Sequence, residues 1–216
     1  MSASKPKPGP DRRVALAQYR RRSAVYDLEL ALFEPIRREA IARLDLARGQ
    51  TVIDVGCGTG LSFALLREGV GSGGRIVGIE QSPEMIDKAR ERVTRLGWRN
   101  VELLCSPVES APLRRSADAA LFHFTHDILR RGDAVQRVLR HLKPGARIVA
   151  SGLKWSRGWA RGANLLVLPA ALHSTTTLEG LDEPWSHLAT RIDVLQIESR
   201  LMGTVYIATG LLAGRR

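Results

Sequence analysis

Residues 51–60 bring a carboxylate and three glycines together in one short stretch, Thr-Val-Ile-Asp-Val-Gly-Cys-Gly-Thr-Gly. The β-branched residues before Gly56 favour a buried strand, and the residues after Gly60 favour a helix. Glycines at such a turn let the backbone bend tightly and approach a ligand closely. Glu80 follows Gly60 by 20 residues and ends a second β-branched run. At that separation a carboxylate accepts hydrogen bonds from ribose hydroxyls, so the pattern predicts a site for a nucleoside.

A second group of reactive side chains follows a later apolar run, where His123, His126 and Asp127 stand close together. Histidine titrates near neutrality and could take a proton from a hydroxyl or an ammonium group. The alternative is a polar loop in which Asp127 caps a helix. A metal site built from these three residues lacks further ligands nearby in the sequence, so we predict no metal.

The elements that must position these residues alternate between strands and helices. Ser82 is a good helix N-cap and Pro83 suits the first helical position. The predicted helices are 60–68, 83–96 and 134–142, and the predicted strands are 51–55, 75–79, 101–104, 117–122, 146–151, 191–198 and 203–209. Alternation of this kind predicts an α/β fold with a doubly wound, mostly parallel sheet. The last two strands are separated by only a few residues, which predicts an antiparallel hairpin.

The flanks of this core carry weaker signals. Residues 1–10 are basic and proline-rich and are expected to form a flexible tail. Residues 11–48 are expected to form a helical lid, with an apolar stripe at i, i+4 spacing and Pro35 either between two helices or in the first turn of the second. Residues 49–216 would form the main domain, with a variable substrate insert at about 153–190.

The motifs from Val52 to Gly60, at Gly78-Ile79-Glu80 and from Ser82 to Met85 resemble those of the class I S-adenosylmethionine-dependent methyltransferases. The resemblance extends from about residue 44 to residue 150. The glycine spacing is G-x-G-x-G, which argues against the dinucleotide fingerprint and so against NAD. The resemblance implies a Rossmann-like, seven-stranded sheet of order 3-2-1-4-5-7-6, with the last strand antiparallel. It also implies S-adenosyl-L-methionine as the cofactor.

The resemblance further implies which residues touch the cofactor. They are Asp54, Gly56, Cys57, Gly58, Gly60, Glu80, Gln81, Met85, Val108 and Phe122. Pro107 stands where the family often has an acidic residue near the adenine, so the adenine would be read by the backbone at Val108, or by Ser106 or Glu109. Candidate catalytic residues are His123 and His126, and candidate acceptor contacts are Tyr19, Tyr26 and Trp155.

The composition limits the partners. The chain has 216 residues, no apolar run near the ~20 residues that span a bilayer, and two cysteines, which favours a cytoplasmic setting. The net charge is +11, and 28 of the 33 basic residues are arginine. Such a surplus attracts anions, although arginine-rich composition can also reflect genomic base composition.

We therefore expect a methyltransferase that acts on N or O of a small-molecule acceptor. Residues 60–66 and 203–208 also resemble bacterial phospholipid N-methyltransferases, so a lipid head-group amine at an anionic membrane surface is an alternative. A non-catalytic protein that binds S-adenosylmethionine is a further alternative, supported by Pro107. The Asn/Asp-Pro-Pro-aromatic signature is absent after residue 122, which argues against nucleic acid as the acceptor. The sequence leaves the oligomeric state open.

Overall fold

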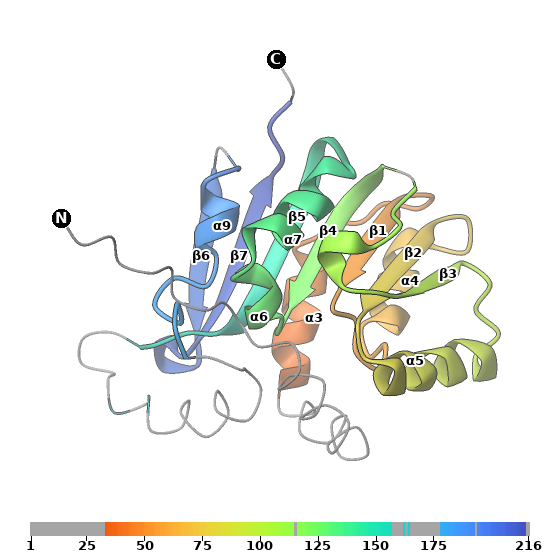
Figure 1. The fold of residues 1–216 in the computed structure, drawn as a ribbon, viewed down its shortest axis with the longest axis horizontal. Coiled ribbons are helices and arrows are strands. Elements are labelled where there is room, and N and C mark those ends of the chain that lie inside the picture. The colour runs from red at the N-terminus through yellow and green to blue at the C-terminus, as the bar shows by residue number, and fades with distance from the viewer. Residues whose placement is uncertain are drawn as a thin grey trace.

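The computed structural model describes residues 33–114, 116–156, 162, 164, 178–192 and 194–214. Seven strands form one sheet of order β3-β2-β1-β4-β5-β7-β6 (Figure 1). The strands are β1 Thr51–Val55, β2 Arg75–Glu80, β3 Val101–Cys105, β4 Ala117–His123, β5 Leu142–Leu153, β6 Leu195–Arg200 and β7 Val205–Leu211. The helices are α3 Glu34–Ala42, α4 Phe63–Val70, α5 Pro83–Arg95, α6 His126–Leu129, α7 Gly132–Arg140 and α9 Ser186–Ala189, with short 3-10 turns η2 Val108–Ser110 and η4 Leu201–Gly203.

The pairing of the strands confirms the predicted fold. Strands β1 to β5 are parallel to their neighbours, while β7 runs antiparallel to both β5 and β6. Val55 of β1 pairs with Ile79 of β2 on one side and with Phe122 of β4 on the other. The carboxyl ends of these central strands therefore meet at one edge of the sheet, where ligands bind in open α/β folds.

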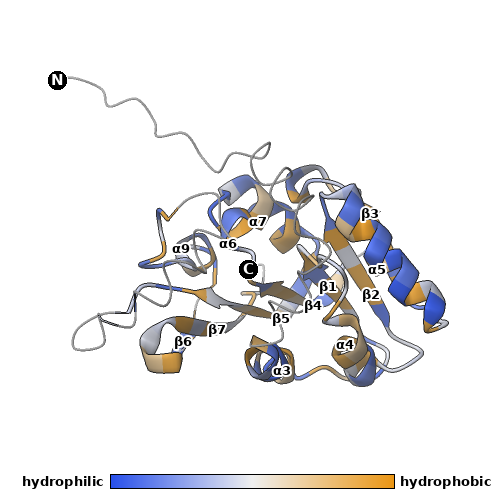
Figure 2. Ribbon diagram, turned by 90° about the horizontal axis from the view of Figure 1, so that it is seen from below, coloured by the Kyte–Doolittle hydropathy of each residue, from blue (hydrophilic) through white to orange (hydrophobic). Residues whose placement is uncertain are grey.

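Helices cover both faces of the sheet. Figure 2 shows α3 and α4 on one side and α6, α7 and α9 on the other. The side chains divide accordingly into two buried clusters. One lies between the sheet and α7 and α9, and includes Phe122 and Tyr206. The other lies under α3, α4 and α5, and includes Leu44 and Phe63. Strands buried on both faces explain why the predicted strands were short apolar runs rather than alternating ones.

The local signals at α5 and α3 have the expected structural consequences. The backbone N–H of Met85 donates to Ser82 Oγ at 3.3 Å, and Pro83 occupies the first turn, so the predicted cap of α5 is confirmed. Helix α3 begins at Glu34 with Pro35 in its first turn, which was one of the two alternatives for that proline. The tail 1–10 and most of the lid 11–48 lie outside the described residues, as does half of the insert 153–190.

Several predicted boundaries were wrong. Helix α4 begins at Phe63 and not at residue 60, because Gly60 has a φ of +78° and belongs to the preceding turn. Strand β5 begins at Leu142, where the sequence predicted the end of a helix, because Leu142 already pairs with Ala117 before a register shift. Strand β6 begins at Leu195 and not at residue 191.

Within the described part of the chain, no helix is long and apolar enough to cross a membrane.

Candidate functional site

The turn between β1 and α4 is built on glycines in left-handed backbone conformations. Gly56, Gly58 and Gly60 have φ values of +69°, +55° and +78°. A Cβ on Gly56 would lie 2.6 Å from Thr125 Cγ2, so this position has no room for a side chain. The backbone N–H groups of Gly56 and Cys57 donate to the carbonyl of Ile79 at 2.8 and 3.0 Å. The turn is thereby fixed to the end of β2, where the next functional residue lies.

Glu80 ends β2 and contacts the glycine turn directly. Its Oε2 accepts from the backbone N–H of Gly58 at 3.2 Å, and its Oε1 accepts from Ser82 N–H at 2.8 Å. The residue is 9% exposed. Burial raises the pKa of its carboxyl, while the amides of Ser82 and Gly58 act in the opposite direction. These bonds fix the carboxylate and leave acceptor capacity for a ligand hydroxyl. The sequence spacing of 20 residues between Gly60 and Glu80 thus places the Glu80 carboxylate next to the glycine turn.

Asp54 lies beside this turn, near the end of β1, and is buried. Burial raises the pKa of its carboxyl to about 7; Arg37 opposes that shift, and Glu80 adds to it. Its Oδ2 is buried and has no hydrogen-bond partner among the described residues. A buried carboxylate oxygen without a partner is costly unless a ligand satisfies it. An ammonium group, such as the one S-adenosylmethionine carries, would fit this position.

Arg37 is a pocket residue that the sequence analysis did not single out. It is 3% exposed and lines the same pocket as Asp54, Gly58 and His123. It projects from the buried face of α3, together with Ala40 and Ile41. The signal was present in the sequence, because residues 37, 41 and 44 are spaced by four and three and share one helical face. A charged residue within that apolar stripe could have marked it.

The two histidines do not act as a pair in the structure. His123 lines the pocket, and its Nδ1 lies 2.8 Å from Ser151 Oγ. Burial, with a smaller effect from Arg37, lowers its pKa to about 3. Its Nε2 is buried and has no hydrogen-bond partner among the described residues. His126 is not among the residues that line this pocket.

His126 instead contacts the C-terminal part of the insert. Its Nε2 lies 3.0 Å from the carbonyl oxygen of Glu179. Burial lowers its pKa to about 4, although the bond to Glu179 acts in the opposite direction. The geometry supports an anchoring role for His126 more directly than a role in proton transfer. The α6 helix that it begins has Thr125 as N-cap and no side-chain cap.

The remaining predicted contacts occupy varied environments. Cys57 and Met85 are buried, and Gln81 is half-buried at the start of the turn before α5. Val108 and Phe122 belong to the core cluster under α7, and Phe122 is 0% exposed, so its side chain is a core side chain in this structure. Trp155 is half-buried against the other cluster. Tyr19 and Tyr26 lie outside the described residues.

Among the described residues, no group of three His, Cys, Asp or Glu side chains could hold a metal ion.

Comparison with known proteins assigns this arrangement to a family. The family described as "Methyltransferase domain" matches residues 46–195. Over 131 residues the chain is 34% identical to the aklanonic acid methyltransferase DauC of Streptomyces sp. (strain C5), which covers 58% of this chain and 59% of that protein. Over 107 residues it is 30% identical to the protein-L-isoaspartate O-methyltransferase of Methanococcus aeolicus, covering 50% of this chain and 48% of that protein.

The chain thus aligns with only part of the length of these relatives, about half in both cases. Among solved structures, a SAM-dependent methyltransferase from Aquifex aeolicus superposes with a TM-score of 0.62 at 23% identity, covering 88% of this chain and 98% of that one. That likeness independently supports the fold.

Proposed function

Because the chain belongs to the class I S-adenosylmethionine-dependent methyltransferases, we propose that it transfers a methyl group to a carboxylate oxygen of a small acid. S-adenosylmethionine would supply an already activated methyl group. The protein then has to align two reactants and exclude water. The observation that carries the acceptor class is the position of His123, which lines the pocket and whose Nε2 is buried without a hydrogen-bond partner among the described residues.

The cofactor contacts follow from the charges around the glycine turn. Glu80 would accept hydrogen bonds from the ribose hydroxyls, and Asp54 would hold the ammonium group. Arg37, buried on the same side of the pocket, would hold the carboxylate of the same amino-acid moiety. The bare backbone of Gly56 and Gly58 would let the ligand approach closely. Burial strengthens each of these charged contacts, because the surroundings contain little water.

The acceptor class follows from proton transfer. A hydroxyl or ammonium acceptor must lose a proton, which requires a base whose pKa lies near the working pH. The pKa of His123 is lowered to about 3, so its ring is neutral at pH 7 and is a very weak base. A carboxylic acid, with an ordinary pKa of about 4, arrives already ionised. If Ser151 donates to Nδ1, the free Nε2–H of His123 could donate to such a carboxylate.

The names of two relatives agree with an acidic acceptor. One is named for aklanonic acid and the other for protein-L-isoaspartate, although a third is named for arsenite. The net charge of +11 would also attract an anionic acceptor.

The test is methyl transfer from labelled S-adenosylmethionine to matched sets of acceptors. Each set contains a carboxylic acid, the corresponding primary alcohol and the corresponding amine. We expect transfer to acids alone. At saturating S-adenosylmethionine, when Asp54 is already paired with the ammonium group, kcat/KM for the acid should be nearly constant between about pH 5 and 8, because neither the acceptor nor His123 titrates there. His123→Gln, whose side-chain amide can still donate near the Nε2 position, should keep activity better than His123→Ala. Transfer to the alcohol or amine, with a rate that rises with a pKa near 7, would contradict the proposal.

A lipid head-group amine remains the second candidate. Leu201 and Met202 are 53% and 60% exposed at the tip of the β6–β7 hairpin, and both have positive φ. Exposed apolar residues on a cationic protein favour contact with an anionic membrane surface. Co-sedimentation with phosphatidylserine vesicles at low salt tests this candidate. Binding that Leu201→Ser/Met202→Ser abolishes would support it, and absence of binding would exclude it.

A further inference from the structure

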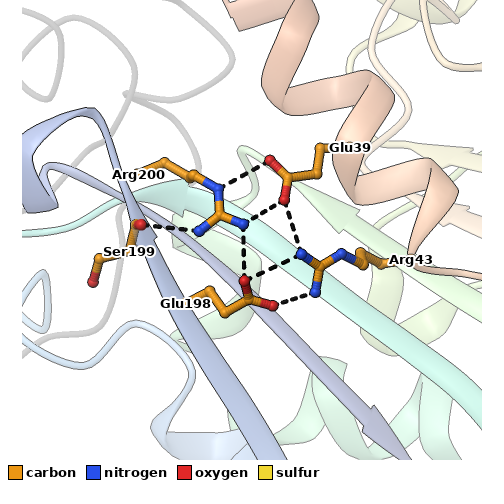
Figure 3. Close-up of polar contacts among 5 residues, drawn as sticks. All are labelled: Glu39, Arg43, Glu198, Ser199 and Arg200. Atoms are coloured by element: carbon orange, nitrogen blue, oxygen red, sulfur yellow. Dashed lines mark hydrogen bonds and ion pairs between the residues drawn. The ribbon is translucent and has the colours of Figure 1, made fainter.

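Four charged side chains form a closed ring that joins helix α3 to the edge strand β6 (Figure 3). We call this ring, made of Glu39, Arg43, Glu198 and Arg200, the charge clasp. Arg43 Nη2 lies 3.0 Å from Glu39 Oε1 and 3.1 Å from Glu198 Oε2. Arg200 Nε lies 3.0 Å from Glu39 Oε2, and its Nη2 lies 2.8 Å from Glu198 Oε2. Each acid therefore contacts both arginines, and each arginine contacts both acids.

The clasp lies at the border of the buried cluster under α3. Glu198 pairs with Ile207 across the β6–β7 ladder, and Arg200 pairs with Val205. Val205 and Ile207 are both buried in that cluster. The clasp therefore begins where the apolar contacts of α3 with the sheet end, and it connects residues that are about 155–161 positions apart in sequence.

The same helix carries Arg37 into the pocket. Arg37 lies on the buried face of α3 with Ile36, Ala40 and Ile41. Apolar packing on that face is non-directional and tolerates small slides and rotations of the helix. Directional, charge-assisted hydrogen bonds to a neighbouring strand do not tolerate them.

We propose that the charge clasp positions α3 so that Arg37 reaches the carboxylate of the cofactor. The clasp residues do not touch the ligand; they are positioning residues that act through Arg37. The proposal rests on the cofactor contact proposed above for Arg37 and is independent of the identity of the methyl acceptor. It predicts that breaking the clasp weakens cofactor binding, although the clasp lies on the surface outside the pocket.

The electrostatics of the clasp agree with strong mutual pairing. Hydrogen bonds from Arg43 and then Arg200 lower the pKa of Glu198 to about 2. The hydrogen bond from Arg200 lowers the pKa of Glu39, although burial opposes this. All four side chains are partly exposed, so salt will screen their attraction. An ionic-strength dependence of cofactor binding is therefore expected.

The experiment measures the dissociation constant of S-adenosylhomocysteine by calorimetry, without acceptor, for four proteins that form a cycle. These are the wild type, Arg43→Gln, Arg37→Gln and the double variant. We expect Arg43→Gln to weaken binding roughly 3- to 10-fold, while Arg43→Lys, which keeps the charge but not the paired guanidinium hydrogen bonds, should retain only part of the affinity. In the Arg37→Gln background, Arg43→Gln should have no further effect, because the group it positions is gone. The matched control is Lys143→Gln, which breaks the surface ion pair between Lys143 and Asp118.

Each other outcome has a definite meaning. If Arg43→Gln weakens binding equally with and without Arg37, the clasp does not act through Arg37 and the proposal is overturned. Unchanged binding in Arg43→Gln overturns it as well, whatever happens to the melting temperature. If Arg37→Gln binds as well as the wild type, the proposed contact of Arg37 fails, and the clasp proposal fails with it. None of these outcomes depends on finding the acceptor, so they are separable from a failure of the acid-acceptor proposal.

Discussion

At the scale of one residue, burial of the Asp54 carboxylate lowers the stability of the ligand-free protein, and in our proposal a bound ligand compensates for this cost. Its carboxyl is buried beside Glu80, and its Oδ2 has no hydrogen-bond partner among the described residues. Desolvation of an ionised carboxylate is unfavourable unless a partner compensates. The nearby Arg37 compensates only in part, because the pKa of Asp54 is still raised to about 7. A cationic ligand group would provide the rest.

This arrangement predicts a pH-dependent gain of stability in Asp54→Asn. The folded-state pKa of about 7 lies above the ordinary value of 3.8, so the native state retains a proton that the unfolded chain releases. Stability is therefore fully present below about pH 4 and is lost as the pH rises through 7. Asp54→Asn removes that loss, so we expect its free energy of unfolding relative to the wild type to rise by more than about 1 kcal/mol between pH 4 and pH 8, since one pKa unit is worth about 1.4 kcal/mol.

Urea denaturation of the ligand-free protein at several pH values would measure this. The exposed Asp87 of α5 provides the control, because Asp87→Asn should show no comparable trend. The Asp54→Asn variant should also bind S-adenosylmethionine more weakly. A stability difference that does not change with pH would show that Asp54 is not held at an elevated pKa.

At this scale the sequence predicted the proximity of some residues around the pocket and missed that of others. The glycines and Glu80 were identifiable because their chemistry depends on local spacing along the chain. Arg37 was not identified, because its proximity to Asp54 arises from packing of α3 against the sheet. The low pKa of His123 could not be read from the sequence either, since burial causes it.

At the scale of elements, our proposal makes cofactor binding depend on the turn between β1 and α4. Gly56 needs both a left-handed conformation and the absence of a side chain, because a Cβ would meet Thr125 Cγ2 at 2.6 Å and Ile128 Cδ1 at 2.9 Å. Gly97, after α5, has a similar φ of +63° but open space around its Cα. Substitution of these two glycines therefore distinguishes two costs. Both variants carry the strain of a left-handed backbone, but only a side chain at position 56 overlaps with neighbouring atoms.

We predict that Gly56→Ala costs roughly 2–5 kcal/mol of stability, the sum of about 1–2 for the left-handed backbone and about 1–3 for overpacking. Gly97→Ala should lose only the stability that the left-handed backbone costs, and it should leave cofactor binding unchanged. Chemical denaturation and calorimetry with S-adenosylhomocysteine would compare the two variants. Equal losses of stability and unaffected binding in both would mean that the turn adapts, contrary to this account.

Elements with strong local signals were predicted, and those defined by distant contacts were not. Ser82 and Pro83 determine where α5 begins from within the chain itself. The start of β5 depends instead on the pairing of Leu142 with Ala117, and β6 is an edge strand whose start depends on its ladder with β7. The antiparallel hairpin was predictable, because a short connection cannot cross over to a parallel strand.

At the scale of the whole molecule, the pocket and the charge clasp lie at different parts of the sheet. The carboxyl ends of β1, β2 and β4 hold Asp54, Glu80 and His123 at one edge. The charge clasp ties α3 to the far border of the sheet and, in our proposal, transmits its position to the pocket. The net charge of +11 favours anionic partners.

The central claim is that Glu80 and the glycine turn bind the adenosyl part of S-adenosylmethionine, and calorimetric titration of Glu80→Gln tests it most directly. Glutamine can still accept one backbone amide bond, but it loses the charge that strengthens bonds from ribose hydroxyls, which are worth about 1.5–3 kcal/mol each. The account predicts at least roughly 10-fold weaker binding, with Glu102→Gln on β3 binding as the wild type does. Wild-type affinity in a folded Glu80→Gln variant would contradict it.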